Sequence, residues 1–277
     1  MISGGLRLRA TTLGAAAAAG AVAVLLALGG CAADPSAVAG GRSGQHRPHA
    51  DPPSPEAHPH PRPTPSTVPT PAAVGFDATA HSFDDPASSW VVVNKPRALQ
   101  PLAFTPPELV YPDVSYVNRQ PMRPEVADAL VAMFHAGTQE AGLGFSVQSA
   151  YRSFDSQTRV YDDDVARNGQ AYADTDTARP GHSEHQTGLA VDISAVPARC
   201  SLAACFADTP QGQWLAANAW RFGFLLRYPA DKVAVTGFTF EPWHFRFVGV
   251  PLATQMHATG VTTLEEFFHC AGGAEYH

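Results

Sequence analysis

The spacing of hydrophobic residues predicts three helices in the C-terminal part of the chain. The clearest one covers residues 124–142, where apolar positions recur every three or four residues. A proline at its first position and Gly142 at its end are typical helix boundaries. A second helix is predicted from an N-cap at Ser153 to Asn168, because a glycine follows it. Residues 213–222 also have a helical pattern.

Alternation of apolar and polar residues predicts the strands. Residues 145–150 and 189–193 alternate in this way, and residues 238–240 and 243–248 are further candidates, separated by Pro242. The helices and short strands do not alternate regularly along the chain, as they would in a protein with a parallel sheet. The pattern therefore predicts an α+β fold.

The first thirty residues have the organisation of an export signal. Arg7 and Arg9 are their only charged residues, and an uncharged run follows over residues 10–30. The run ends at Cys31 in the sequence LGGC, which resembles the lipobox of bacterial lipoproteins, in which the signal is cleaved before a lipidated cysteine. We therefore expect residues 1–30 to be a signal peptide and Cys31 to anchor the protein on the extracytoplasmic face of the bacterial membrane. Ordinary secretion and an uncleaved membrane-spanning helix are the alternatives.

Residues 31–75 are predicted to be a disordered linker. They contain eleven prolines and almost no large apolar residue, so they bury too little surface to offset the entropy cost of ordering. Four histidines of this stretch form a candidate metal-binding tract, which we interpret instead as part of a solvated linker: His46, His49, His58 and His60. The globular domain is then residues 76–277.

Charge and cysteine content narrow the functional classes. The chain has 18 Lys and Arg residues against 25 Asp and Glu residues, and this net charge of −7 argues against a nucleic-acid partner. In an exported protein, Cys200 and Cys205 enclose a short loop and favour a disulfide, which leaves Cys270 as an odd thiol. The alternative is a zinc site made of these three cysteines and a histidine, for which the spacing is poor.

Three polar positions on the predicted strands point away from the core. Over residues 189–193 the apolar side chains share one face, which puts Asp192 on the other. Over residues 243–248 the aromatic side chains share one face, which puts His244 and Arg246 on the other. If the two strands belong to one sheet, Asp192 and His244 project into the same cleft.

His185 and Glu241 are brought to that cleft by bends in the chain. Each has an odd spacing from its partner, seven residues before Asp192 and three before His244, so a straight strand would turn it to the opposite face. Gly188 in the first case and a proline in the second allow the chain to change direction. Two imidazoles and one carboxylate form a three-ligand zinc site with an open position for water, and a nearby glutamate that is not a ligand can take a proton from that water.

Three segments in this region together resemble the VanY-type zinc D-alanyl-D-alanine carboxypeptidases. They are SAYRS from Ser149 with Gln157 following, then PGHSEHQTGLAVDIS, and then EPWHFRFVG, in the order and spacing of that family over residues 147–249. The VanY enzymes belong with the VanX dipeptidases and a wider group that shares the hedgehog-type fold. The resemblance implies a hedgehog/DD-peptidase-like domain with a central, mostly antiparallel sheet flanked by helices.

The same resemblance implies one Zn²⁺ per chain and a role for each of seven residues. The implied zinc ligands are His185, Asp192 and His244, and the implied catalytic base is Glu241. Arg152 corresponds to the arginine that polarises the scissile carbonyl or stabilises its oxyanion, and Gln157 and Ser183 match positions that hold the terminal peptide of the substrate.

The expected function is hydrolysis of the terminal D-Ala-D-Ala bond of peptidoglycan stem peptides by a monomeric zinc D,D-carboxypeptidase. Enzymes of the resembled group that cut the L,D bond of tetrapeptide stems use the same residues, so L,D-carboxypeptidase activity is the alternative. A cell-wall-binding lipoprotein without catalysis is a third hypothesis, which the presence of Glu241 disfavours. Residues 76–123 contain no motif that bears on function.

Overall fold

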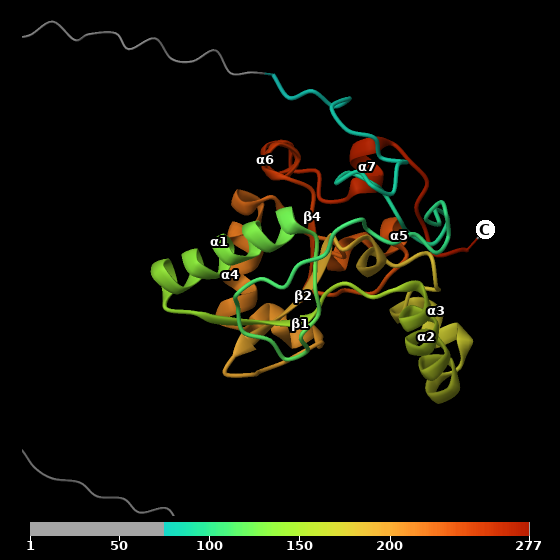
Figure 1. Ribbon diagram of the computed structural model, residues 1–277, viewed down its shortest axis with the longest axis horizontal. Helices are drawn as coiled ribbons and strands as arrows, with labels where there is room; N and C mark the ends of the chain where they lie inside the picture. The colour runs from blue at the N-terminus through green and yellow to red at the C-terminus, as the bar shows by residue number, and fades with distance from the viewer. Residues whose placement is uncertain (1–74, 277) are drawn as a thin grey trace, which may run out of the picture. The chain divides into compact units, whose positions relative to one another are not determined.

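The described part of the chain is built around a four-stranded antiparallel sheet, with its strands in the order β1-β2-β4-β3. Figure 1 labels β1, β2 and β4 of this sheet. The strands are β1 (Gly144–Ser149), β2 (Ala190–Val196), β3 (Phe224–Leu226) and β4 (His244–Phe247). The computed structural model describes residues 75–276, so the predicted signal, Cys31 and nearly all of the linker lie outside the described residues. Helices combined with an antiparallel sheet confirm the predicted α+β class.

Helices surround this sheet. The α-helices of the described residues are α1 (Pro124–Ala141), α2 (Phe154–Asn168), α3 (Gln170–Asp176), α4 (Pro210–Asn218), α5 (Val233–Thr236), α6 (Val250–Thr259) and α7 (Leu264–Phe268). Short 3₁₀ turns are η1 (Glu184–Thr187), η2 (Ala204–Asp208), η3 (Ala219–Phe222) and η4 (Ala230–Lys232). In Figure 1, α1 and α4 lie at one end of the view, and α2 and α3 lie at the other.

The first two predicted helices begin and end for the expected reasons. Pro124 is the first residue of α1, and Gly142 ends it in a left-handed conformation with φ of 65°. The hydroxyl of Ser153 accepts a hydrogen bond of 3.2 Å from the amide of Ser156 and caps α2.

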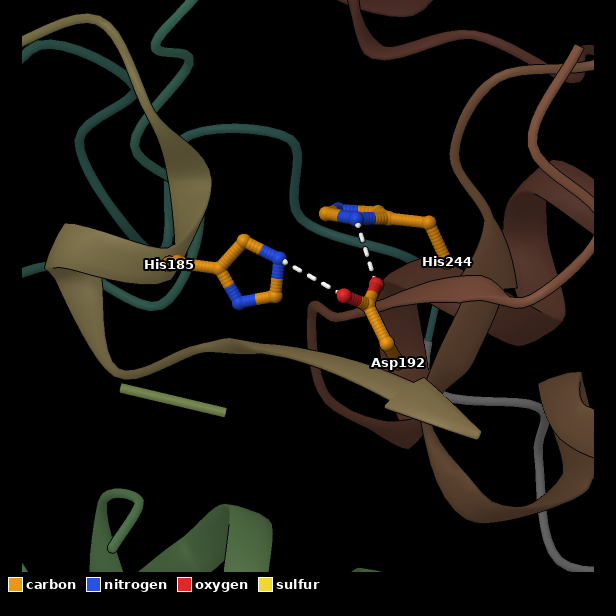
Figure 2. Close-up of side chains that lie close together, drawn as sticks. All are labelled: His185, Asp192 and His244. Carbon is orange, nitrogen blue, oxygen red and sulfur yellow. Dashed lines mark ion pairs between the residues drawn. The ribbon is translucent and has the colours of Figure 1, made fainter. Parts of the chain in front are cut away.

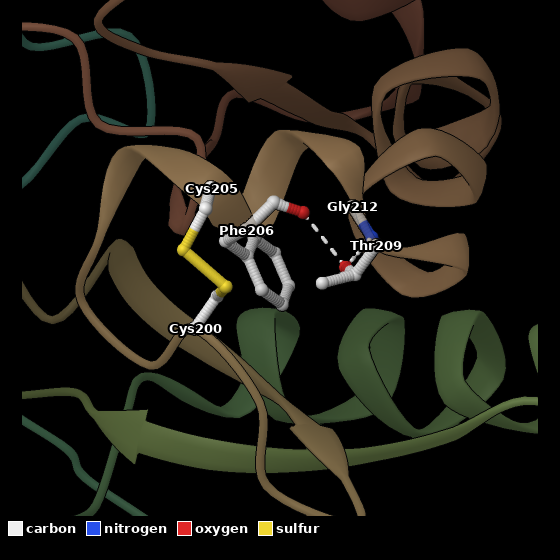
Figure 3. The surroundings of a disulfide bond; sticks show 5 residues. All are labelled: Cys200, Cys205, Phe206, Thr209 and Gly212. Carbon is white, nitrogen blue, oxygen red and sulfur yellow. Dashed lines mark hydrogen bonds between the residues drawn. A yellow bond between two sulfur atoms is a disulfide. The ribbon is translucent and has the colours of Figure 1, made fainter. Parts of the chain in front are cut away.

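The third predicted helix begins earlier and ends earlier than its apolar pattern indicates. The hydroxyl of Thr209 accepts a hydrogen bond of 3.0 Å from the amide of Gly212, and it starts α4 at Pro210 (Figure 3). The helix ends at Asn218 and the chain continues as η3 to Phe222. Figure 3 also shows the disulfide between Cys200 and Cys205, which confirms that prediction and lies just before this cap.

The predicted strand over residues 238–240 is wrong. Phe238 is buried, but it packs against Tyr228 with ring centroids 4.9 Å apart, and it lies in irregular structure. Gly237 precedes it with φ of 81°, and the amide of Thr239 donates to the carbonyl of Thr175 rather than to a strand. The segment is apolar because it packs on another ring, and its residues make no sheet ladder.

The apolar side chains form two clusters. The larger cluster fills the space between the sheet, α1 and α4, and includes the stacked rings of Phe134 and Phe145 with Trp214 beside them. The smaller cluster joins the segment around Phe76 and Trp90 to α6 and α7. Residues 76–123, which have little regular structure, therefore contribute to the core although no periodicity marks them.

Among residues 75–276, none of the helices is long and apolar enough to cross a lipid bilayer. Cys270 is half-buried and has no disulfide partner within these residues.

Candidate active site

The pairing of β2 with β4 creates the centre of the candidate site. The antiparallel register places Asp192 directly opposite His244 and Val191 opposite Phe245. The apolar pair is buried in the larger cluster, and the polar pair projects from the other face. The prediction that Asp192 and His244 share one cleft is confirmed, because both side chains line the same cavity.

His185 reaches this cavity from the short turn η1. Gly188 ends the turn with φ of 69°, a conformation that glycine adopts without strain, and so redirects the chain into β2. The Nδ1 atom of His185 lies 2.7 Å from the carbonyl oxygen of Ala150 and must carry the hydrogen that the carbonyl accepts. The Nε2 atom is therefore the one that faces the cavity with a free lone pair.

The two histidines and Asp192 converge on a small volume (Figure 2). The Nε2 atom of His185 lies 3.3 Å from Asp192 Oδ2, and His244 Nδ1 lies 3.1 Å from Asp192 Oδ1. One donor atom from each residue lies within 4.8 Å of the others, and each residue is at most 5% exposed. A set of two imidazoles and one carboxylate at this separation fits the ligands of a catalytic zinc ion.

The hydrogen bonding of Asp192 supports that fit. Its Oδ1 atom is buried and makes no hydrogen bond with good geometry to any described residue, in spite of its closeness to His244. A buried carboxylate oxygen without a partner is costly, and a cation bound between the three residues would satisfy it.

The charges of the three groups depend on one another. Burial lowers the pKa of His185, so its ring is neutral, as a metal ligand must be. Burial also works against protonation of His244, but its contacts with Asp192 and Glu184 raise the pKa of His244 to about 9. Burial would raise the pKa of Asp192, but the two histidines hold it well below its usual range. A bound cation would take the place of the proton on His244.

Glu241 lies beside the three converging residues. Its Oε2 atom is 3.7 Å from His244 Nδ1, and its backbone carbonyl accepts a hydrogen bond of 3.1 Å from the amide of His244. This turn contains Pro242, so the bend predicted there is confirmed. Burial raises the pKa of Glu241 to about 8, and the negative charge of Asp192 adds to the effect.

Arg152 enters the cavity from an irregularity in β1. The pairing of β1 with β2 shifts register between Val147 and Ser149, which puts Ser149 opposite Asp192. The hydroxyl of Ser149 accepts a bond of 3.0 Å from Arg152 Nη2, and Gln157 Oε1 accepts one of 2.9 Å from Nη1. The guanidinium is thus fixed in orientation at the wall of the cavity.

Gln157 and Ser183 lie in the same wall of the cavity, but they differ in how far their polar groups are already hydrogen-bonded within the protein. Gln157 is fully buried, and its amide nitrogen donates to the carbonyl of Ala178 at 2.7 Å, so both ends of its amide group are engaged within the protein. Ser183 is 4% exposed and lines the cavity. The structure brings all seven residues of the implied site together, and substrate contact by these two stays a prediction.

The cavity measures about 220 Å³. Apart from the seven residues, its wall includes Asp176, Leu202, Tyr228, Phe238 and Trp243. Tyr228 stands out among them, because it is buried with its ring centroid 4.8 Å from that of His244. Its position after β3 has no periodic signal, and only the folded chain brings it to His244.

A cluster of buried charges that sequence patterns do not indicate adjoins the cavity, and one of its members, Glu184, lines the cavity wall. Glu184 Oε1 accepts bonds from Arg227 at 2.7 Å and from Arg246 at 2.8 Å, and Arg227 also pairs with both oxygens of Glu265. The four residues come from four separate parts of the chain, and the arginines are fully buried. Strand alternation predicts Arg246 in the cleft with His244, but its guanidinium bonds to Glu184 and to backbone carbonyls instead.

The chain is similar in sequence and fold to known carboxypeptidases. A family model described as "VanY: D-alanyl-D-alanine carboxypeptidase" matches residues 119–250. The "Putative carboxypeptidase YodJ" of Bacillus subtilis is 39% identical over 192 residues, which cover 68% of this chain and 69% of that protein. A D-alanyl-D-alanine carboxypeptidase of Enterococcus faecium is 35% identical over 146 residues, which cover 53% of this chain and 43% of that protein. The chain belongs to the VanY family of D-alanyl-D-alanine carboxypeptidases.

Solved structures agree with this assignment. The LD-carboxypeptidase LdcB has a TM-score of 0.62 and 39% sequence identity, covering 67% of this chain and 88% of its own. The D,D-pentapeptidase VanY from a VanB-type resistance cassette, solved in complex with Zn(II), has a TM-score of 0.54 and 33% identity, covering 65% of this chain and 98% of its own. These neighbours confirm the hedgehog-like peptidase fold.

Proposed function

We propose that the protein is a zinc-dependent D,D-carboxypeptidase that removes the terminal D-alanine from peptidoglycan stem peptides. The observation that carries the proposal is the register of β2 with β4, which pairs Asp192 with His244 in a cavity that also contains His185 and Glu241. His185, Asp192 and His244 would hold one zinc ion. When bound, zinc supplies a Lewis acid for the scissile carbonyl and lowers the pKa of a water molecule.

Glu241 is proposed as the base. Its carboxylate is buried in the cavity wall next to the proposed ligands, where it can accept the proton of the attacking water and later return it to the leaving amine. The positive charge of zinc would lower the pKa of Glu241 and keep it ionised at neutral pH. Because Glu241 lies in the site, the alternative of a wall-binding protein without catalysis has no support in the geometry.

Arg152 is proposed to stabilise the negative charge that develops on the carbonyl oxygen. Its guanidinium is held by Ser149 and Gln157, so it is oriented before substrate arrives. Donors fixed in advance in a water-poor site are effective because they do not have to reorganise during the reaction. Ser183 remains available for the terminal peptide of the substrate.

A second candidate activity is L,D-carboxypeptidase action on tetrapeptide stems. The observation in its favour is that the LD-carboxypeptidase LdcB has a higher TM-score and identity than the D,D-pentapeptidase VanY. The names of the family model and of the enterococcal relative favour D,D-activity. Contacts of a pocket wall with one methyl group discriminate between two substrates by only about 1–3 kcal/mol. Some activity on both kinds of stem peptide is therefore expected.

The test is a competition between pentapeptide and tetrapeptide stems at equal concentration with the zinc-loaded protein, followed by mass analysis. A higher kcat/KM for release of D-alanine from the pentapeptide supports the proposal. Preferential trimming of the tetrapeptide would establish the L,D activity instead, and no cleavage of either would refute both.

We further propose that the protein is exported, anchored through a lipid on Cys31 and active as a monomer. The support is the basic and apolar N-terminal pattern that ends in LGGC. Cys31→Ser should release the protein from membrane fractions. A variant that stays in the membrane would identify an uncleaved helix as the anchor.

A further inference from the structure

The four buried charges that adjoin the cavity form one connected group. We call Glu184, Arg227, Arg246 and Glu265 the buried ion cluster. Each carboxylate contacts at least one arginine at 3.0 Å or less, and all four side chains are at most 2% exposed. Two negative and two positive groups give no net charge, so the charges of the cluster balance one another, although Glu184 also lines the cavity.

The two carboxylate oxygens of Glu184 nevertheless contact different groups. Oε1 accepts the hydrogen bonds of both arginines, while Oε2 lies 3.4 Å from His244 Nε2. The other ring nitrogen of His244, Nδ1, lies 3.1 Å from Asp192 Oδ1. The imidazole of His244 is thus held between a carboxylate of the cavity and a carboxylate of the buried ion cluster.

We propose that Glu184 is a positioning residue for the metal ligand His244. It accepts the hydrogen on Nε2 and so leaves the lone pair of Nδ1 directed to the site. A ligating histidine needs such a partner, because the group that binds one ring nitrogen sets which nitrogen carries the proton and how the ring is turned. This inference rests on the proposed zinc function, since it assumes that His244 is a ligand.

The connections of the cluster fit this role. Glu184 precedes His185 in η1, and Arg246 lies two residues after His244 on the same face of β4. The bond between Glu184 and Arg246 therefore ties together the two elements that hold the proposed histidine ligands. In addition, the amide of Arg227 donates to the carbonyl of His244 at 3.2 Å. These contacts fix the ring of His244 from its backbone and from its outer nitrogen.

A purely structural role would make Glu184 equivalent to Glu265, which provides a matched control. Glu265 pairs with Arg227 through both oxygens and also accepts a bond of 2.8 Å from Asn94, but it has no contact with His244 within the described residues. Glu184→Gln and Glu265→Gln make the same isosteric change in the same cluster. Each leaves two buried arginines with one carboxylate, so both should lower the melting temperature of the full-length protein.

Only Glu184→Gln should weaken zinc binding. We expect a loss of zinc affinity of about 10- to 100-fold, measured by competition with a chromophoric chelator, and a changed visible spectrum of the cobalt(II)-substituted protein. Glu265→Gln should keep both the affinity and the spectrum of the unmodified protein. Equal losses in the two variants, or an unchanged affinity in Glu184→Gln, would overturn the positioning role.

A measurement on the unmodified protein covers the case in which Glu184→Gln fails to fold. In the zinc-bound protein, ¹⁵N NMR of the His244 ring should find the proton on Nε2 and none on Nδ1. A proton on Nδ1 would overturn the proposal. Failure of the unmodified protein to bind zinc would refute the ligand assignment itself, which separates that outcome from a failure of the positioning role alone.

Discussion

The two faces of strands β2 and β4 are almost equally buried and yet differ completely in what stabilises them. On one face, Val191 and Phe245 are at most 1% exposed and pack into the larger apolar cluster. On the other face, Asp192 and His244 are at most 5% exposed and contact only a few specific groups. Burial of the first pair is favourable in itself. Burial of the second pair costs solvation free energy, which hydrogen bonds and opposite charges must offset.

This difference explains why the two faces tolerate change differently. Dispersion contacts on the apolar face come from many neighbours, so the loss of one methyl group is a small fraction of the total. The polar face depends on single donors and acceptors, and Asp192 Oδ1 still has no hydrogen-bonding partner within residues 75–276. Single substitutions on the apolar face should therefore affect mainly stability, and substitutions on the polar face should also affect the proposed metal binding and chemistry.

The largest effect is expected for His244→Ala. It removes one of three proposed ligands and leaves Glu184 Oε2 without its ring partner. The unmodified protein should contain about one zinc per chain, and the variant should lose most of it and all measurable peptidase activity. Metal analysis after gel filtration measures this, with circular dichroism to verify folding. A variant that keeps its full zinc content would disprove the ligand assignment.

Glu241→Gln should separate the base from the ligands. The amide keeps the size of the side chain but cannot accept a proton, so kcat should fall by about 10²-fold or more. Zinc content should stay near that of the unmodified protein, because Glu241 is not a proposed ligand. Discontinuous assays of D-alanine release from a pentapeptide stem give kcat. Near-normal turnover would place the proton transfer on another group.

A smaller loss is expected for Arg152→Lys. Lysine keeps the positive charge but loses the planar set of donors that Ser149 and Gln157 hold in place. We expect kcat to fall by less than the roughly 10²- to 10³-fold typical of a deleted oxyanion donor, with zinc content unchanged. Steady-state kinetics distinguishes the alternatives, since a rise in KM at constant kcat would mean that Arg152 binds the substrate carboxylate.

The smallest effect on chemistry is expected on the apolar face. Ile193 is fully buried next to Asp192 in β2, with its side chain on the opposite face. Ile193→Val should lower the free energy of unfolding by about 0.5–1.5 kcal/mol, while kcat per folded molecule and zinc affinity stay the same. Chemical denaturation tests the predicted change in the free energy of unfolding, and kinetics on the same preparation tests the predicted constancy of kcat. A substantial fall in kcat would show that the two faces are not independent.

Sequence periodicity predicts the parts of the fold that obey one local rule. The apolar spacing locates α1, and the alternation in β2 and β4 is enough to place Asp192 and His244 on the same side of the sheet. The zinc hypothesis follows from those faces and from the family motifs. The short apolar run around Phe238 gives a false strand signal, because packing on a ring and pairing in a sheet require similar residues.

Long-range pairing has no counterpart in local sequence patterns. The strand order puts β4 between β2 and β3, and the register shift in β1 aligns Ser149 with Asp192, neither of which has a local signal. The buried ion cluster joins Glu184 to Arg227 and Arg246 across 43 and 62 residues. In the sequence only Arg246 has a local signal, as a polar position on its strand, and nothing marks the other charges as buried. Only their meeting in the folded chain makes burial possible.

The aromatic packing at the start of the described chain has a mechanical consequence. The ring of Phe76 lies 5.6 Å from that of Trp90 and 5.8 Å from that of Phe267, and Trp90 donates a hydrogen bond of 2.9 Å to the carbonyl of Val248, just past β4. Tension applied through the residues that precede Gly75 would first load these ring contacts. If the preceding residues act as the proposed tether, the contacts with α7 would have to break before the force reached β4 and His244, so this packing would shield the candidate site from tension.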